Sequence, residues 1–295
     1  MAMKNNKHAY LIMAHGSWRQ LEQLLSLLDD ERNDIFLHVD SKAGDIDMSY
    51  FQRFIQHSNL FFVKRRSVTW GGDSQIQLEM DMIESAVHKH QYDYLHLLSG
   101  VDFPIKSKEY IFRFFEANKG KEFLMIDRLR DNESAIVRVN YHYLFQNQIG
   151  RTYKGWRYFV QKAIIKAERL LHYSRKSKEL KDKLHKGPNW FSITGLFAQY
   201  VISKKQWIRK QFQYTLCADE VFLQTVIYDS PFKDKIYINN NLEYTNLRAT
   251  DWQRGNPYVW QNEDWDYLSK SPYLFARKFD TAKDTYIYEQ IQKLY

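Results

Sequence analysis

The chain contains a single cysteine, Cys217, among its 295 residues. One thiol cannot build an internal disulfide framework or a multi-cysteine metal site, so both are excluded. Because Cys217 stands beside an acidic pair, a nucleophilic role is one interpretation. A small buried hydrophobic residue is the more ordinary role of a lone cysteine, and we expect that role here.

Long apolar runs are also missing. No window approaches the roughly 18 apolar residues that a membrane-spanning helix requires, and the apolar run at residues 9–14 is shorter than the core of a signal peptide. Cytoplasmic residence is therefore expected. Hydrophobic residues nevertheless make up 44% of the chain and aromatic residues 16%, which allows a sizeable core and excludes a disordered protein.

Several motifs of nucleotide and metal chemistry are absent as well. The chain has no Gly-x-x-x-x-Gly-Lys-Ser/Thr loop, no Gly-x-Gly-x-x-Gly after its first strand and no His-Glu-x-x-His. It also lacks an Asp-x-Asp motif at the end of a strand, since Asp102 stands alone and residues 45–47 lie in a loop. His172 and His185 have no second ligand at a suitable spacing, so we expect no zinc.

What the sequence does contain is an alternation of apolar strands and amphipathic helices. Apolar runs at residues 8–14, 35–39, 60–63 and 94–98 predict buried strands, with helices after the first and third of them. This order is typical of an α/β protein whose sheet is mainly parallel and has helices on both faces. No repeat, low-complexity tract or linker divides the chain, so we expect one domain over residues 1–295.

Polar turns follow these predicted strands. Because ligands bind beyond the carboxyl ends of the strands in such sheets, we expect the turns to converge on a pocket. The four turns are His15-Gly16, Asp40-Ser41-Lys42, Trp70-Gly71-Gly72 and Ser99-Gly100-Val101-Asp102.

The net charge of +8 is concentrated in one segment. Residues 151–186 hold twelve basic and three acidic side chains, so this segment carries +9 and the rest of the chain is nearly neutral. An amphipathic helix is expected there, within a basic helical insertion at about residues 141–188. The segment is either a solvated helical hairpin or a surface that meets anionic lipid head groups or a lipid-linked phosphate substrate. A nucleic-acid-binding protein would also explain the charge, but the segment has no base-reading motif.

A pair of carboxylates, Asp219 and Glu220, precedes the apolar run at residues 221–227. We expect the pair in the first turn of a helix, where the helix dipole keeps a carboxylate ionised. An ionised carboxylate in that position is suited to act as a general base toward a substrate hydroxyl. Capping of the helix is the commoner reason for acidic residues there, and the pattern alone leaves both interpretations open.

Seven motifs of this sequence occur in an order and spacing that resemble glycosyltransferase family 14. That family contains the core-2/I-branching β-1,6-N-acetylglucosaminyltransferases and the peptide O-xylosyltransferases. The resemblance spans nearly the whole chain apart from the basic segment, and its tryptophan-containing parts look more like the xylosyltransferase branch. The motifs are Ala14-His15-Gly16, residues 35–42, Thr69-Trp70-Gly71-Gly72, residues 97–106, Ala218-Asp219-Glu220, residues 251–254 and residues 275–280.

The resemblance implies a Rossmann-like GT-A fold and an inverting transfer, without a metal or other cofactor, of GlcNAc or xylose from a UDP-sugar to a hydroxyl of a glycan. Glu220 matches the family's catalytic base. Asn189 and Trp190 match a segment close to the sugar, where the xylosyltransferases have Asp before the Trp, and this departure leaves the donor sugar open. By the same resemblance, Arg254 and Lys278 match the basic pair that holds the diphosphate. The positions around the uridine are matched by His15, Asp40, Lys42 and Trp70.

Physical chemistry agrees with these roles. An inverting transfer needs one base for the acceptor hydroxyl and a means of stabilising the UDP leaving group. Where no metal is bound, Arg254 through bidentate contacts and Lys278 as a point charge are suited to that task. Asp219 either orients Glu220, contacts the acceptor or caps the helix. Trp252 either stacks on a sugar ring or lies in the core, and Asp102 is expected to hold its turn.

The animal enzymes of this family carry a membrane anchor and many cysteines, and this sequence shows neither. We therefore expect a bacterial, cytoplasmic member that extends or branches a surface polysaccharide precursor on a lipid-linked acceptor. A catalytically inactive carbohydrate-binding relative is the alternative. Such a relative would keep the aromatic residues but would not need Glu220, Arg254 and Lys278 together.

Overall fold

A central sheet of six strands runs through the molecule in the order β3-β2-β1-β4-β7-β6. The structure is a computed structural model, and it describes residues 7–127, 132–241 and 243–295. The first four strands of the sheet are parallel, and β7 runs against both of its neighbours. The predicted α/β class with a mainly parallel sheet is confirmed. The strands are β1 (His8–Ala14), β2 (Asn33–Val39), β3 (Asn59–Phe62), β4 (Tyr94–Ser99), β6 (Phe123–Leu124) and β7 (Phe191–Thr194).

A second, smaller sheet lies beside the first. It consists of β5 (Phe103–Pro104), β8 (Arg248–Thr250) and β9 (Phe275–Arg277), in the order β5-β9-β8. No sequence pattern predicted it, because strands of two or three residues are too short to show an alternation of apolar and polar positions.

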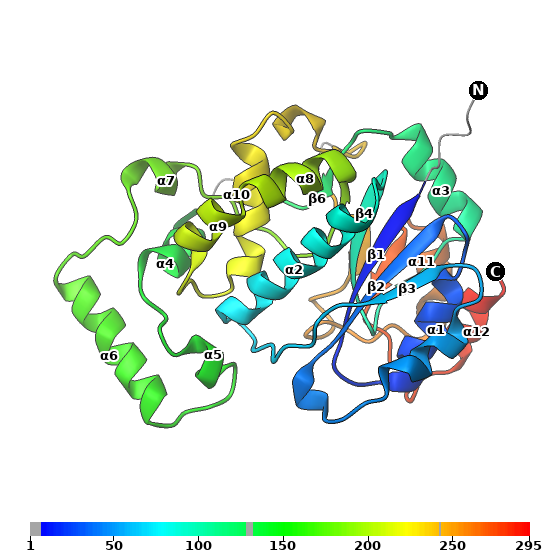
Figure 1. The fold of residues 1–295 in the computed structure, drawn as a ribbon, viewed down its shortest axis with the longest axis horizontal. Helices are drawn as coiled ribbons and strands as arrows, with labels where there is room; N and C mark the ends of the chain where they lie inside the picture. Colours follow the sequence, from blue (N-terminus) through cyan, green and yellow to red (C-terminus); the bar gives the residue numbers. More distant parts are fainter. Residues whose placement is uncertain (1–6, 128–131, 242) are drawn as a thin grey trace.

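Helices cover both faces of the large sheet (Figure 1). The first helix α1 and the C-terminal α12 lie on one face, while α2 and α8 to α10 lie on the other. The helices are α1 (Trp18–Leu28), α2 (Asp73–Lys89), α3 (Lys108–Ala117), α4 (Asn132–Asn140), α5 (Gln146–Ile149), α6 (Trp156–Leu170), α7 (Lys178–Asp182), α8 (Gly195–Ser203), α9 (Lys205–Phe212), α10 (Phe222–Tyr228), α11 (Trp265–Lys270) and α12 (Tyr286–Gln292).

Successive residues of β1 enter two separate cores. Tyr10 and Ile12 pack with the leucines of α1, whereas Ala9 and Leu11 pack with α2. All four side chains are buried. Because side chains alternate across a strand, a strand buried on both faces is continuously apolar, which is why the runs at residues 8–14 and 35–39 were readable from the sequence.

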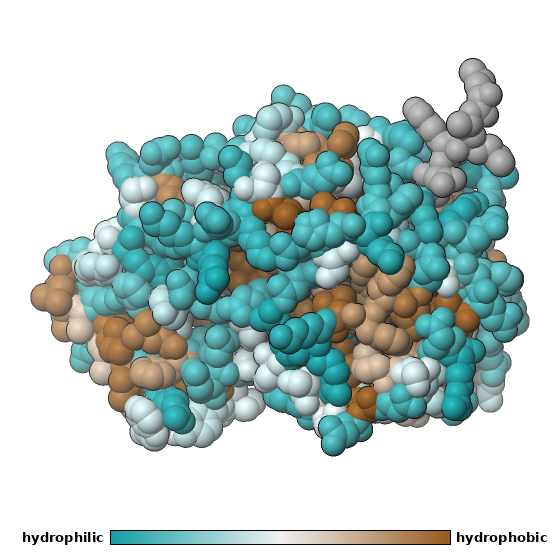
Figure 2. Space-filling model, in the orientation of Figure 1, coloured by the Kyte–Doolittle hydropathy of each residue, from teal (hydrophilic) through white to brown (hydrophobic). Residues whose placement is uncertain are grey.

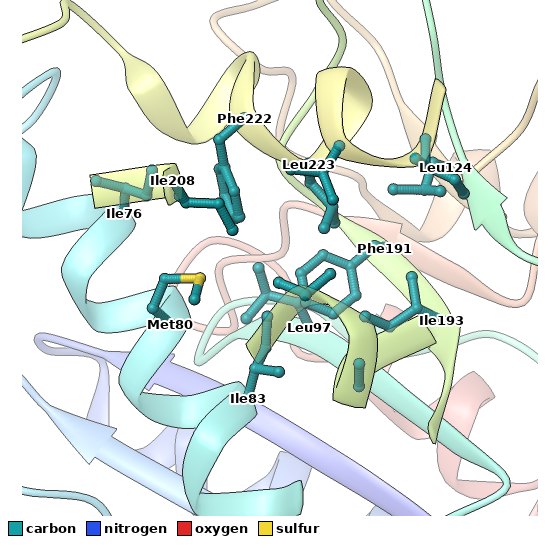
Figure 3. Packing of buried hydrophobic residues seen from close by; sticks show 14 of the residues in the cluster. Ile76, Met80, Ile83, Leu97, Leu124, Phe191, Ile193, Ile208, Phe222 and Leu223 are labelled. Atoms are coloured by element: carbon teal, nitrogen blue, oxygen red, sulfur yellow. The ribbon is translucent and has the colours of Figure 1, made fainter. Parts of the chain in front are cut away.

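Helix α2 is held by the larger of these cores. Its residues Ile76, Met80 and Ile83 recur at helical spacing and point toward Leu97 of the sheet and Phe222 of α10 (Figure 3). This packing places α2 between the sheet and the segment that carries the predicted acidic pair. The polar residues on the neighbouring face of α2 are therefore held close to that pair.

The predicted basic insertion contains α5, α6 and α7, at the left of Figure 1. Gln161 is the single buried residue of α6. Its carbonyl oxygen accepts from the backbone N–H of Phe145 at 2.9 Å, and its amide donates to Gln146 at 3.2 Å. That the chain forms one domain with an insertion at 141–188 stays a prediction. Within the described ranges, no helix is long and apolar enough to span a bilayer.

The two halves of the large sheet diverge at its centre. Strands β4 and β7 pair over only three positions. Beyond them the buried Arg248 bridges the strands, since its Nη2 donates to the carbonyl oxygens of Leu97 at 3.2 Å and Phe191 at 2.5 Å. Its Nη1 donates to Ser192 Oγ at 2.8 Å. One guanidinium therefore replaces the ladder bonds that the diverging strands no longer make.

Arg248→Ala should lower the free energy of unfolding by about 3 kcal/mol or more, because two buried carbonyls lose their donor and a cavity forms. Denaturant titration of both proteins measures this loss. Arg209→Ala, at an exposed position of α9, is the matched control and should stay within about 0.5 kcal/mol of the parent. A loss of less than about 1 kcal/mol for Arg248→Ala would contradict the bridging role.

Candidate active site

The carboxyl ends of the parallel strands are joined by backbone hydrogen bonds. Asp40 N–H donates to the carbonyl of Ala14 at 2.8 Å, and Gly100 N–H donates to that of Met13 at 2.9 Å. The segment after β9 joins the same edge, because Phe279 N–H donates to the carbonyl of Val101 at 3.0 Å. The turns at residues 15–16, 40–42 and 99–102 therefore share one edge of the sheet with residue 278, while the convergence of all four turns on a pocket stays a prediction.

The Trp70-Gly71-Gly72 turn lies against the acidic segment. Gly71 has a positive φ of 73°, and a Cβ there would lie 3.1 Å from Leu216 Cδ1 and 3.3 Å from Cys217 Sγ. Glycine suits both the conformation and the close approach. The N–H of Cys217 donates to the carbonyl of Gly71 at 2.9 Å. Trp70 itself is half exposed, with the Arg151 guanidinium 5.7 Å from its ring centre.

Cys217 is buried and makes no disulfide. Burial raises the pKa of its thiol to about 12, so the thiolate that a nucleophile requires is disfavoured. The predicted role as a small buried residue is confirmed.

Asp219 and Glu220 do not lie in the first turn of α10. They belong to a separate 3₁₀ turn, η4 (Ala218–Glu220), and Val221 is the N-cap of α10. Burial, followed by the nearby charge of Glu220, raises the pKa of Asp219 to about 7. The expectation that the helix dipole holds both carboxylates ionised is therefore wrong for Asp219. Gln75 of α2 donates to its Oδ2 at 2.9 Å, and its Oδ1 is buried without a partner.

Glu220 has a different environment from its neighbour. Its side chain is 36% exposed, and Arg138 of α4 donates a hydrogen bond to its Oε2. An accessible carboxylate beside a guanidinium is available to a substrate hydroxyl in a way that the buried Asp219 is not. Sequence reasoning missed Arg138, because α4 carries no motif and the chain has 43 basic residues.

The segment before β7 is clamped to this acidic turn. Gly187 N–H donates to the carbonyl of Glu220 at 3.0 Å, and Gln224 of α10 donates to the carbonyl of Pro188 at 2.9 Å. These bonds fix Asn189 and Trp190 beside the acidic pair, and their place close to a sugar stays a prediction. The amide of Asn189 in turn donates to Glu79 Oε1 of α2 at 3.0 Å.

Arg277 connects Trp190 with the carboxyl edge of the sheet. Its guanidinium lies 4.0 Å from the centre of the Trp190 ring, and its Nε lies 3.8 Å from Asp102 Oδ1. Asp102 is fully buried and accepts from the N–H and hydroxyl of Ser99, so it holds its turn as expected. Two nitrogens of Arg277 are buried without a hydrogen-bond partner. Its place directly before Lys278 was the signal that could have identified it.

The two predicted diphosphate cations lie in neighbouring segments, since Trp260 N–H donates to the carbonyl of Lys278 at 3.0 Å. Arg254 is held by Asp251 at 2.6 Å and Asp264 at 2.8 Å, so its charge is compensated and it must exchange a partner to bind a phosphate. Lys278 makes no side-chain hydrogen bond or ion pair with any residue in the described part of the chain. Lys278 is thus the cation already available.

The remaining predicted residues differ in how exposed they are. His15 is exposed, and the Lys42 ammonium bonds to the carbonyl of Val68, 3.8 Å from Asp40. Asp40 also accepts from two backbone N–H groups and so fixes its own loop. Trp252 is 62% exposed, which makes the core interpretation wrong and leaves its face free for a ligand.

Neither of two surface hollows includes a predicted site residue. One of about 260 Å³ lies between α2 and α9, and one of about 400 Å³ lies among α7 to α10. Among the described residues, no group of three His, Cys, Asp or Glu side chains could hold a metal ion. Independence from a metal stays a prediction.

The described residues of this α/β protein include an accessible carboxylate, a lysine without a side-chain partner among them and exposed aromatic side chains, an arrangement suited to binding a ligand. The protein's family follows from comparison with known proteins. Residues 8–269 match the Core-2/I-Branching enzyme family, and the chain belongs to that family.

Several named relatives are similar over almost the whole chain. Xylosyltransferase 2 of Canis lupus familiaris is 25% identical over an alignment of 304 positions, which covers 95% of this chain and 33% of the relative. Xylosyltransferase oxt of Drosophila pseudoobscura pseudoobscura is 23% identical over 98% of this chain and 33% of the relative. The chain thus spans about a third of their length. The apo structure of mouse xyloside xylosyltransferase 1 covers 92% of this chain and 96% of its own, at 9% identity and a TM-score of 0.36.

Asp219→Asn should stabilise the protein more at about pH 8 than at about pH 5. The folded pKa of Asp219 is about 7 and the ordinary value is 3.8. Between these values Asp219 is ionised in the unfolded state and protonated in the folded state, so the free energy of unfolding falls as the pH rises. Above about pH 7 the folded protein bears the full free-energy cost of a buried, ionised Asp219. Asparagine cannot ionise and therefore removes that cost.

Thermal melting of Asp219→Asn and of the parent at the two pH values measures the difference between their melting temperatures. The variant should melt at least about 3 °C higher than the parent at the higher pH. Asp234→Asn, at an exposed carboxylate in η5 (Lys233–Lys235), is the matched control. Equal melting temperatures for Asp219→Asn and the parent at both pH values would contradict the buried, protonated state.

Proposed function

We propose that this chain is an inverting glycosyltransferase that moves a sugar, GlcNAc or xylose, from a UDP-sugar to a hydroxyl of a glycan without a metal ion. The observation that carries the proposal is the accessible Glu220, fixed beside Asn189 and Trp190 in a member of the Core-2/I-Branching enzyme family. The names of the xylosyltransferase relatives support the sugar-transfer chemistry.

In the proposed reaction, Glu220 removes the proton of an acceptor hydroxyl as its oxygen attacks the anomeric carbon of the donor. The bond from that carbon to the diphosphate oxygen breaks, and UDP leaves with the bonding electron pair. Lys278 would stabilise the charge that develops on the diphosphate. Arg254 would join it after exchanging Asp251 or Asp264 for a phosphate oxygen. Arg138 would hold the Glu220 side chain in position.

Glu220→Gln should reduce transfer by about 100-fold or more, because an amide cannot accept the acceptor proton. UDP binding should be retained, since the base does not contact the nucleotide in this scheme. The rise in melting temperature with UDP measures binding, with and without EDTA. Glu289→Gln, at an exposed position of α12, is the matched control.

A Glu220→Gln variant that keeps its transfer activity would contradict the role of Glu220 as the general base. A UDP-induced stabilisation that disappears with EDTA would contradict independence from a metal. If no uridine nucleotide stabilises the parent protein while free glycans do, a carbohydrate-binding protein without transferase activity becomes the better description.

We also propose that the protein works at a membrane surface in bacterial polysaccharide synthesis, on a lipid-linked acceptor. Helix α6 supports this part. Its outward face carries apolar side chains at helical spacing, and Figure 2 shows hydrophobic surface where α6 lies in Figure 1. Basic residues flank the stripe, which suits an interface with anionic lipid. The most exposed apolar members are Trp156, Phe159, Leu170 and Leu171, which are 58%, 64%, 70% and 78% exposed.

The parent protein should sediment with phosphatidylglycerol vesicles at low salt and much less with phosphatidylcholine vesicles, because the basic flanks attract anionic head groups. Replacing Phe159 and Leu171 together by glutamate should abolish sedimentation. Leu196→Glu, at a 57% exposed leucine of α8, is the control and should leave it unchanged. A parent protein that stays in the supernatant with anionic vesicles would contradict the membrane role.

A further inference from the structure

The larger of the two surface hollows, of about 400 Å³, lies between α7 on one side and α8, α9 and α10 on the other. Its volume falls within the range of about 300–1,000 Å³ that is usual for small-molecule sites. The described residues that line it include none of the predicted site residues. The hollow is therefore a second place at which this protein could hold a ligand.

Two aromatic side chains border the hollow, Tyr200 of α8 and Trp207 of α9. Both are partly exposed, and both pack against the larger core. The ring centre of Trp207 lies 6.0 Å from that of Phe212, and the ring centre of Tyr200 lies 5.7 Å from that of Phe232. The core thus holds the two rings in place at the wall of the hollow. Such rings offer an apolar surface to the C–H groups of a sugar and a polar tip to its hydroxyl groups.

A row of alternating charges lies on the α7 side of the hollow. The Lys183 ammonium is 3.2 Å from Glu179 Oε1 and 3.2 Å from Asp229 Oδ1. The three side chains are 40%, 81% and 48% exposed, so a ligand can reach them. A carboxylate accepts from one hydroxyl group and an ammonium donates to the next. The row therefore matches the neighbouring hydroxyl groups of a sugar ring.

Further donors in the lining have no partner in the described part of the chain. Gln211 Oε1 accepts from Lys176 at 3.4 Å, which leaves the two N–H groups of its amide free. The Lys204 ammonium lies 5.4 Å from the centre of the Tyr200 ring and makes no hydrogen bond or ion pair with a described residue.

The formal charges of this lining cancel, because it contains two lysines, one glutamate and one aspartate. Complementarity of charge favours the partner whose potential matches the surface that it meets. A lining without net charge, with rings on one side and many donors and acceptors on the other, suits a neutral ligand with many hydroxyl groups.

We propose that this hollow is a second glycan-binding site, which binds a neutral oligosaccharide between the rings of Trp207 and Tyr200 and the polar groups of Lys183 and Gln211. The inference goes beyond the proposed function, because the site requires neither a UDP-sugar nor Glu220. Helix α10 lines the hollow and follows the acidic turn directly, so the two sites share one element. In a transferase, the second site would hold a part of the glycan away from the reacting hydroxyl.

The test titrates the full chain, without any nucleotide, with neutral tetrasaccharides of GlcNAc, xylose and glucose, and binding is followed by NMR. At least one of them should bind. A hyaluronan tetrasaccharide, which carries carboxylates, should bind at least about fivefold more weakly. Gln211→Ala and Lys183→Met should each weaken the binding of the neutral tetrasaccharide about fivefold or more, because each removes a donor from the lining. Gln206→Ala, at an exposed position of α9 outside the lining, is the matched control.

Trp207→Leu should abolish binding, since it removes the larger of the two rings. Trp207 also packs against the core, so this variant is read only if it melts cooperatively. Gln211→Ala and Lys183→Met change partly exposed side chains and provide the measurement if it does not. Trp252→Ala, at the exposed ring predicted to stack on a sugar in the candidate active site, should leave this binding unchanged.

Neutral tetrasaccharides that bind equally well to Gln211→Ala, Lys183→Met and the parent would overturn the proposal. So would loss of binding in Trp252→Ala alone, because the glycan would then occupy the candidate active site. Failure of all three neutral tetrasaccharides to bind, or equally tight binding of hyaluronan, would overturn it as well. None of these results depends on a UDP-sugar or on transfer, so the failure of this site is distinguishable from the failure of the proposed function.

Discussion

The buried guanidinium of Arg248 is the interaction on which the site depends. It lies 4.9 Å from the centre of the Phe275 ring and donates to the carbonyls of Leu97 and Phe191, so it joins the small sheet to both halves of the large one. A buried charge is tolerated only where hydrogen bonds replace its hydration, and here the acceptors come from strands that have separated. Because β4 and β7 pair at only three positions, Trp190, directly before β7, is not part of the sheet. The candidate site therefore lies where the pairing of these two strands ends.

The charges around this opening fall into two groups of opposite sign. On one side, Glu220 shares its neighbourhood with two buried acids on η4 and α2, and Arg138 is the cation beside it. On the other side, Lys278 and Arg277 lie at the edge formed by the ends of β4 and β9. The Trp190 ring stands against the Arg277 guanidinium between them. In the proposed reaction, proton transfer and phosphate binding need opposite potentials, and these two groups of side chains would supply them at separate places.

How much was predictable from the sequence differs between elements for physical reasons. The strand at residues 8–14 is buried on both faces, so its apolar run was visible and its bounds were predicted correctly. The small sheet and the 3₁₀ turn of the acidic pair are too short to leave a periodic pattern. The motif pointed to Glu220, but its partner Arg138 lies 82 positions away, and Glu79 lies 110 positions from Asn189. Contacts of that kind are set by how elements pack, which local pattern does not encode.

Helix α6 is attached to the rest of the molecule in an unusual way. Of its fifteen residues only Gln161 is buried, and that side chain reaches Gln146, whose own amide donates to the carbonyl of Trp70. Substitutions at exposed positions far from buried networks change the free energy of unfolding little. The outward face of α6 is therefore free to diverge in sequence while the carboxylates and cations of the site stay where they are. A protein built this way can change the outer face of α6 over evolution without disturbing the side chains of its candidate site.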